Sequence, residues 1–161
     1  MISGRVVNAS PLIFLTHVGL LDVLDEPGVP AVVPDVVVSE IGAHGAKDPA
    51  VLAVQSASWL KVVTPPIIPT EVAAWGLDAG EAAVLAIALA QPGTQAVLDD
   101  LAARRCAAAL GIPTQGTLGL ILVAKRLGMI PEVRPVLDLL RQAGLYVSDR
   151  LVQAVLNQAG E

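Results

Sequence analysis

Short runs of apolar, often β-branched residues alternate with longer segments of helical pattern along the chain. The pattern predicts strands at residues 5–7, 31–33 and 96–98, a strand or edge segment at 60–63, and a short extended piece at 112–114. Helices are predicted at residues 11–18, 20–24, 35–41, 49–56, 79–90, 101–110, 117–127, 131–143 and 149–159. Such alternation is typical of an α/β fold with a central, mainly parallel sheet covered on both faces. The length of 161 residues fits one domain, 1–161.

Local signals refine this outline. Ser10 is the natural N-cap of the helix at 11–18, with Pro11 in its first turn. The proline-rich stretch 65–69 cannot lie inside a sheet and is predicted to be a linker. The helix at 79–90 is apolar almost all round, so we expect it to be buried on several sides. Burial of this helix would fix the position of Glu81 in its first turn.

The composition excludes several classes of protein. Apolar residues make up 54% of the chain and charged residues 16%, which argues against disorder. The longest apolar stretches, such as 82–90, fall short of the roughly 20 residues that span a bilayer, and the first residues lack a signal-peptide core. The single cysteine, Cys106, fits a small packed residue in a reducing cytoplasm. His17 and His44 have no zinc-binding spacing and are interpreted as ordinary polar residues.

The charge pattern limits how the chain could hold nucleic acid. A net charge of −5 argues against strong nonspecific binding of nucleic acid. An aromatic content of 2% leaves few side chains on which bases could stack. Seven of the ten basic residues lie from Arg104 onward, which leaves room for a local basic face. The high apolar content is also compatible with a buried surface for an oligomer or a partner.

Asp99 and Asp100 stand between the apolar run at 95–98 and the helix predicted at 101–110. Two carboxylates at the end of a buried strand are poor core material, and strand ends of α/β folds are where ligand crevices form. Either residue is equally compatible with a cap for the following helix. A surface ion pair between Asp100 and Arg104, four residues apart, is a further alternative.

Other oxygen-bearing side chains are predicted at the same edge of the sheet. Asn8 ends the first strand, and Asp78 and Glu81 open the buried helix. Glu40 joins them only if its helix runs back across that edge. Carboxylates gathered in one cleft repel each other unless a cation lies among them, and oxygen ligands without Cys or His select Mg²⁺ or Mn²⁺. Taken singly, Asp78 and Glu81 also form an ordinary helix-start pattern, and Glu40 also fits a solvated helix residue.

Six blocks of the chain resemble successive blocks of PIN-like domains, and more narrowly the DUF3368 group of predicted nucleic-acid-binding proteins. The blocks are residues 7–13, 39–40, 77–83, 99–104, 116–119 and 124–126. They occur in the correct order over nearly the whole chain. The pattern Asp-Asp-x-x-Ala-Arg at 99–104 together with Gly-Thr-Leu-Gly at 116–119 is the most specific part of the resemblance.

The resemblance implies a three-layer α/β/α fold and an acidic site that holds Mg²⁺ or Mn²⁺ and hydrolyses RNA phosphodiester bonds. Many PIN domains are ribonuclease toxins encoded beside an antitoxin that blocks the site, and many are dimers. The resemblance therefore implies RNA as substrate, an antitoxin protein as a partner and a homodimer. The metal-binding set maps to the following positions: Asn8, Glu40, Glu81 and Asp99, with Asp100 as the alternative to Asp99. Ser10 matches the small hydroxyl residue that commonly follows the first acid.

The chain departs from the nuclease pattern at Asn8, where active PIN nucleases usually have Asp. An amide oxygen coordinates a hard cation but brings no charge and cannot act as a base. In an active site, Glu81 and Asp99 would hold the ion, and Glu40 and Asn8 would position it or its waters. Arg104 or Lys125 would contact the RNA backbone, with solvated surface charge as the alternative.

Two other functions are compatible with the same residues. The first is a binding module that keeps the fold, with a weakened site, and sequesters RNA or pairs with an antitoxin. The second is a phosphatase with Asp99 as a covalent nucleophile. The phosphatase is disfavoured because the Asp-Asp pair lies late in the chain and no partner Lys or Thr motif accompanies it.

Overall fold

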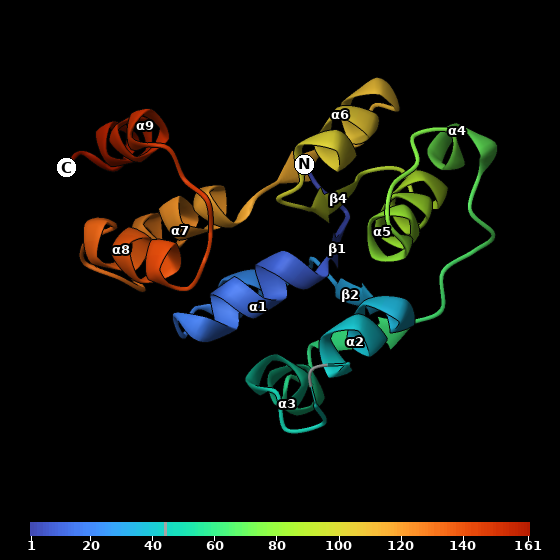
Figure 1. The fold of residues 1–161 in the computed structure, drawn as a ribbon, viewed down its shortest axis with the longest axis horizontal. Helices are drawn as coiled ribbons and strands as arrows, with labels where there is room; N and C mark the ends of the chain where they lie inside the picture. The colour runs from blue at the N-terminus through green and yellow to red at the C-terminus, as the bar shows by residue number, and fades with distance from the viewer. Residues whose placement is uncertain (44) are drawn as a thin grey trace.

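The computed structural model describes residues 1–43 and 45–161, and it contains a parallel β-sheet flanked by helices (Figure 1). The strands are β1 (Gly4–Val7), β2 (Ala31–Pro34), β3 (Leu60–Val63), β4 (Thr94–Val97) and β5 (Thr114–Gln115). Their spatial order is β3-β2-β1-β4-β5, and every neighbouring pair is parallel. In the register of the central strands, Val6 lies between Val32 and Ala96. The predicted α/β class with a mainly parallel sheet is confirmed.

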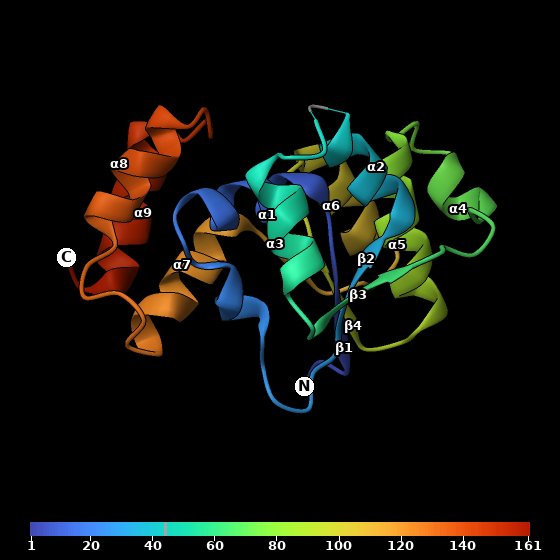
Figure 2. The ribbon, with the colours of Figure 1, turned by 90° about the horizontal axis from the view of Figure 1, so that it is seen from below.

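Helices cover both faces of this sheet. They are α1 (Ala9–His17), α2 (Asp35–Gly42), α3 (Pro49–Ser56), α4 (Thr70–Ala73), α5 (Ala79–Ala90), α6 (Leu101–Ala109), α7 (Thr117–Arg126), α8 (Arg134–Gln142) and α9 (Asp149–Ala159), with a 3₁₀ turn at Leu21–Leu24. Figure 1 shows α1 and α7 on one side of the strands and α5 on the other. Figure 2 shows α8 and α9 at one end of the molecule, beyond α7 and away from the sheet.

The core consists of the strands and of the helix faces that pack on them. β1 is buried along its whole length, because both of its faces are covered. The central part of α5, residues 83–88, is fully enclosed, as its apolar pattern predicts. Cys106 is also buried, and burial raises the pKa of its thiol, so it is a packed residue rather than an exposed nucleophile.

Most predicted elements differ from the observed ones by one to three residues at their ends, which is the normal uncertainty of helix and strand boundaries. Two differences are larger. The short helix α4 follows the proline-rich stretch and was not predicted; it is held in place by Val72, which is fully buried. Ser10 is not the N-cap of α1, because the helix begins earlier and Asn8 occupies the capping position.

The sheet brings many helix starts to one edge. Because all strands are parallel, the carboxyl ends of β1, β2, β4 and β5 lie together, and α1, α2, α6 and α7 begin directly after them. The chain returns through α5 before entering β4, so the N-terminus of α5 lies at this edge as well. In the described part of the chain, none of the helices has the length and apolar character needed to cross a bilayer.

Candidate functional site

The structure assigns different roles to the two adjacent aspartates that follow β4. The Asp99 carboxylate accepts three hydrogen bonds from distant segments: from the Ser10 hydroxyl (2.8 Å), the Thr117 hydroxyl (2.6 Å) and the Thr117 backbone N–H (2.7 Å). Asp99 therefore joins the first turns of α1 and α7 to the end of β4. Asp100 is the N-cap of α6, where its carboxylate accepts from the Ala103 N–H at 3.0 Å.

Asp78 and Glu81 form a reciprocal capping box at the start of α5. The Asp78 carboxylate accepts from the Glu81 N–H (2.8 Å), and the Glu81 carboxylate accepts from the Asp78 N–H (3.3 Å). Burial raises the pKa of Glu81 to about 7, and the negative charges of Asp78 and Asp100 add to this rise. The predicted helix-start pattern of Asp78 and Glu81 is therefore confirmed. The carboxylates of Asp78 and Asp100 also lie near enough to Glu81 to raise its pKa.

Glu40 reaches the same edge because α2 packs against the start of α5. A Cβ built on Gly80 would lie 2.7 Å and 2.9 Å from the two carboxylate oxygens of Glu40, so the absence of a side chain on Gly80 makes room for this acid. Burial raises the pKa of Glu40, and the neighbouring charge of Asp78 raises it further, while a hydrogen bond from the Gly80 backbone opposes the rise. The proximity of Glu40 to α5 was the point that the sequence left open.

Asn8 is buried at the end of β1, and its side-chain oxygen has no hydrogen-bond partner among residues 1–43 and 45–161. Its backbone N–H extends the sheet by donating to the Val97 carbonyl. A buried acceptor without a donor is costly, and in a native protein it commonly marks the place of a water or an ion. The position thus keeps an oxygen acceptor without the charge of a carboxylate.

The chemistry of this edge fits a hard divalent cation, although its acids are not drawn into one compact group. The donors are carboxylate and amide oxygens, two of the acids have raised pKa values, and Asn8 has an unpartnered oxygen. Among the described residues, however, no three His, Cys, Asp or Glu side chains lie close enough together to hold a metal ion. His44, interpreted above as an ordinary polar residue, lies outside the described residues.

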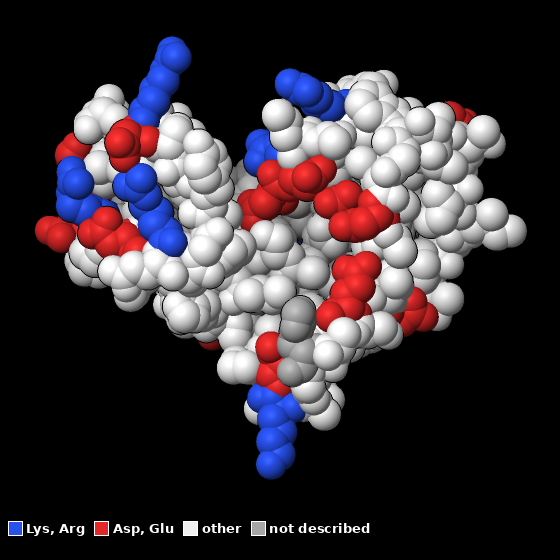
Figure 3. Space-filling model, in the orientation of Figure 1, with Lys and Arg blue, Asp and Glu red and all other residues white. Residues whose placement is uncertain are grey.

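Figure 3 shows acidic side chains gathered near the middle of one face, beside a notch between the end of the molecule that carries α8 and α9 and the rest. The structure has a groove of about 500 Å³ between α6, α7 and α9. Asp99, Arg104 and Gly116 line one part of it, and apolar side chains such as Leu122 line the rest. The acids at this edge of the sheet, called the acidic edge below, are Glu40, Asp78, Glu81, Asp99 and Asp100. Neither Glu40 nor Glu81 belongs to the lining of the groove, so the groove meets the acidic edge only at Asp99.

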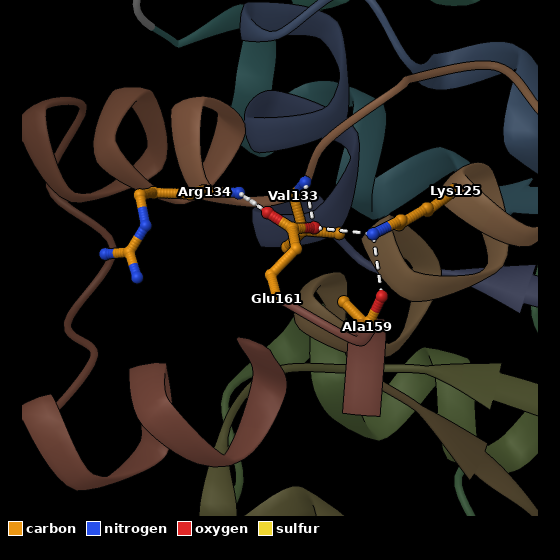
Figure 4. Close-up of polar contacts among 5 residues, drawn as sticks. All are labelled: Lys125, Val133, Arg134, Ala159 and Glu161. Atoms are coloured by element: carbon orange, nitrogen blue, oxygen red, sulfur yellow. Dashed lines mark hydrogen bonds and ion pairs between the residues drawn. The ribbon is translucent and has the colours of Figure 1, made fainter. Parts of the chain in front are cut away.

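The two predicted RNA-contacting cations have different surroundings. Arg104 is exposed and lines the groove beside Asp99; the ion pair with Asp100 that the sequence allowed is absent among the described residues. The Lys125 ammonium instead donates to the Ala159 carbonyl (2.7 Å) and to the Glu161 carboxylate (2.8 Å), as Figure 4 shows. The structure therefore brings Arg104, and not Lys125, to the acidic edge.

Thr117 is a site residue that reasoning from the sequence missed. It is fully buried, and both its hydroxyl and its backbone N–H bind Asp99. The available signal was its place in the Gly-Thr-Leu-Gly block at 116–119, but no local rule assigns a partner 18 residues earlier.

Comparison with known proteins agrees with this fold. Residues 4–161 match the family model DUF3368, which is described as a PIN domain. No curated protein matches the chain. No solved structure matches it either. Since the family model covers nearly the whole chain, the protein belongs to the DUF3368 family of PIN domains.

Proposed function

We propose that this protein is a metal-dependent endoribonuclease that hydrolyses RNA phosphodiester bonds and acts as the toxin of a toxin–antitoxin pair. PIN domains are generally nucleases, and the chain belongs to a PIN family. The observation that carries the proposal is the convergence of Glu40, Glu81 and Asp99 on the edge of the sheet where the strands end. Burial raises the pKa values of Glu40 and Glu81, and the nearby charges of Asp78 and Asp100 add to the rise, which favours a site for a cation over a purely structural role.

In this proposal Glu81 and Asp99 would hold Mg²⁺ or Mn²⁺, and Glu40 and Asn8 would complete or orient its surroundings. A bound ion supplies a hydroxide at neutral pH and offsets charge on the phosphate. Ser10 and Thr117 fix both oxygens of the Asp99 carboxylate, so this ligand is oriented before any ion or RNA arrives. Glu81 is partly protonated near neutral pH in the metal-free chain, so metal binding should release a proton.

Cleavage of a labelled RNA in the presence of Mn²⁺ tests the proposal directly. Glu81→Ala should abolish cleavage, and Glu81→Gln should do the same while keeping the capping box, since Gln also serves at that position. Glu71→Ala is the matched control, because Glu71 is an exposed acid in the first turn of the neighbouring helix α4. Cleavage by Glu81→Gln at the rate of the unmodified protein would refute the assignment.

A second candidate is a module that binds RNA or an antitoxin peptide without cleaving RNA. Two observations favour it: Asn8 is uncharged, and the acids in the described residues form no group of three. Calorimetry with Mn²⁺ separates the two candidates. Heat of binding at millimolar Mn²⁺ supports the nuclease, whereas no heat together with retained RNA binding supports the module. The antitoxin and the homodimer remain predictions, which co-purification with the product of a neighbouring gene and light scattering would test.

A further inference from the structure

Gly116 is a glycine whose backbone does not require one. Its φ is −101° and its ψ is 172°, an extended conformation that any residue adopts. Gly111, five residues earlier, is different: its φ is +71°, and nothing lies within 4 Å of the place where its Cβ would be. Gly111 is therefore explained by its backbone conformation, and Gly116 must be explained by what occupies the space beside it.

That space holds the guanidinium group of Arg104. A Cβ built on Gly116 would lie 2.5 Å from Nη1 of Arg104, 3.3 Å from Oδ1 of Asp99 and 3.5 Å from the Leu98 carbonyl oxygen. The first distance is shorter than real Cβ contacts, so any side chain at position 116 would displace the guanidinium. The missing side chain of Gly116 therefore leaves room for the Arg104 guanidinium next to the Asp99 carboxylate, which follows β4.

The Arg104 guanidinium forms none of the ion pairs found in the described part of the chain, even though Asp99 is close. Both oxygens of Asp99 already accept hydrogen bonds from Ser10 and Thr117, so the charge of this carboxylate is partly satisfied without the guanidinium. Arg104 is exposed and lines the groove of about 500 Å³ that opens beside Asp99. An arginine held in this way keeps its donors free for an anion in the groove.

We propose that Arg104 binds a backbone phosphate of the RNA in the groove beside Asp99, and that Gly116 is the residue that positions it. The inference rests on the proposed function and names the group that recognises the substrate. A planar guanidinium donates two parallel hydrogen bonds to a phosphate, which a lysine cannot reproduce. One cation at this point also offsets the repulsion between an RNA phosphate and the carboxylates of the edge.

Binding of a short fluorescent single-stranded RNA, measured by anisotropy in EDTA, tests the phosphate contact without cleavage. Arg104→Gln should weaken binding about tenfold and reduce the slope of log affinity against log salt by about 0.7. Arg104→Lys should keep the slope and lose part of the affinity. Arg105→Gln is the control: it removes the same charge from the next residue of α6, which is exposed and outside the lining of the groove.

Gly116→Ala tests whether the space beside Gly116 positions the Arg104 guanidinium. It should weaken RNA binding as much as Arg104→Gln does, and the double variant should be no weaker than either single variant, because both remove one contact. Thermal unfolding of Gly116→Ala shows whether the fold survives; if it does not, the three arginine variants decide. Equal losses in Arg104→Gln and Arg105→Gln, no loss in Arg104→Gln, or no RNA binding by the unmodified protein would each overturn the proposal.

The outcomes separate this inference from the proposed function. RNA binding that depends on Arg104 without any Mn²⁺-dependent cleavage would remove the nuclease and keep the phosphate contact. Mn²⁺-dependent cleavage with the same KM and the same RNA affinity in Arg104→Gln would keep the nuclease and remove the contact.

Discussion

Glu81 and Glu161 both accept hydrogen bonds from backbone N–H groups at a helix start, yet their pKa values move in opposite directions. Glu81 accepts from Asp78 at the start of α5, and burial with nearby negative charge raises its pKa to about 7. Glu161 accepts from Val133 and Arg134 at the start of α8, and hydrogen bonds from Lys125 and from Val133 lower its pKa to about 2. Burial and like charges act on Glu81, whereas a lysine and two backbone N–H donors act on Glu161.

The comparison shows two ways of using a carboxylate. Around Glu161, a lysine and two N–H groups satisfy the charge and tie the end of the chain to α7 and α8 (Figure 4). Around Glu81, the nearest charges are Asp78 and Asp100, and no cation of the described chain forms an ion pair there. A region that keeps unfavourable charge where a neutral side chain would be more stable is typical of a functional site.

Asp99 lies on the acidic edge, yet hydrogen-bond donors surround its carboxylate, as they surround that of Glu161. Removing one of these donors should give the largest change in stability. Thr117→Val keeps the shape of this buried side chain and removes the hydroxyl that donates to Asp99. Loss of a hydrogen bond to a charged acceptor should lower the free energy of unfolding by about 2 kcal/mol. Urea denaturation measures it, with Thr70→Val, at an exposed position of α4, as the control. Equal, small effects in both variants would show that Asp99 does not depend on Thr117.

The fold was largely predictable, because the periodicity of strands and helices is local information. The site was predictable only in part. The sequence places Asn8, Glu81 and Asp99 at one edge once the strands are known to be parallel. It does not give Ser10 its role, because the hydroxyl binds a carboxylate 89 residues away instead of capping its own helix.

The same limit applies to the cations. Arg104 and Lys125 look equivalent as sequence features, and each lies in a block that resembles the family. Only the tertiary structure shows that Lys125 binds Ala159 and Glu161, 34 and 36 residues later, while Arg104 lies over Gly116. Long-range partners of this kind are set by packing of whole elements, which no local pattern encodes.

Lys125→Gln should remove the ion pair of Glu161 and so reduce the difference in pKa between Glu161 and Glu81. The variant loses the hydrogen bond to the Ala159 carbonyl, which should lower the free energy of unfolding by about 1 kcal/mol at neutral pH. Arg126→Gln is the matched control, since Arg126 is the next residue of α7, is exposed and forms no ion pair among the described residues. If Arg126→Gln destabilises as much, the contact at the end of the chain is not the cause.

The opposite pKa shifts predict opposite dependences of stability on pH. Glu81 has a folded pKa of about 7, above the ordinary glutamate value of 4.5, so the unfolded chain loses this proton first and stability falls as the pH rises from 4.5 to 7. Glu161 has a folded pKa of about 2, below 4.5, so its contribution is complete above pH 4.5 and is lost as the pH falls toward 2. Both curves refer to the metal-free chain.

Urea midpoints measured across this range in EDTA separate the two windows. Glu81→Gln should flatten only the upper window and make the protein more stable than the unmodified chain above pH 7. Glu161→Gln should flatten only the lower window. The comparison fails if either variant changes both windows equally, because each slope would then belong to other groups.

Asn8→Asp should give the smallest change in stability, and it asks whether the acidic edge lacks only one charge. In EDTA the new carboxylate should lower Tm by about 2 °C, because it is buried at an edge where burial and like charges already raise the pKa values of Glu40 and Glu81. Mn²⁺ should then raise Tm more in Asn8→Asp than in the unmodified protein, since an ion that binds only the folded chain stabilises it by mass action. Asn157→Asp, an exposed change on α9, should respond to neither condition. An Asn8→Asp variant that Mn²⁺ does not stabilise would mean that the edge does not take up the ion even with its missing charge restored.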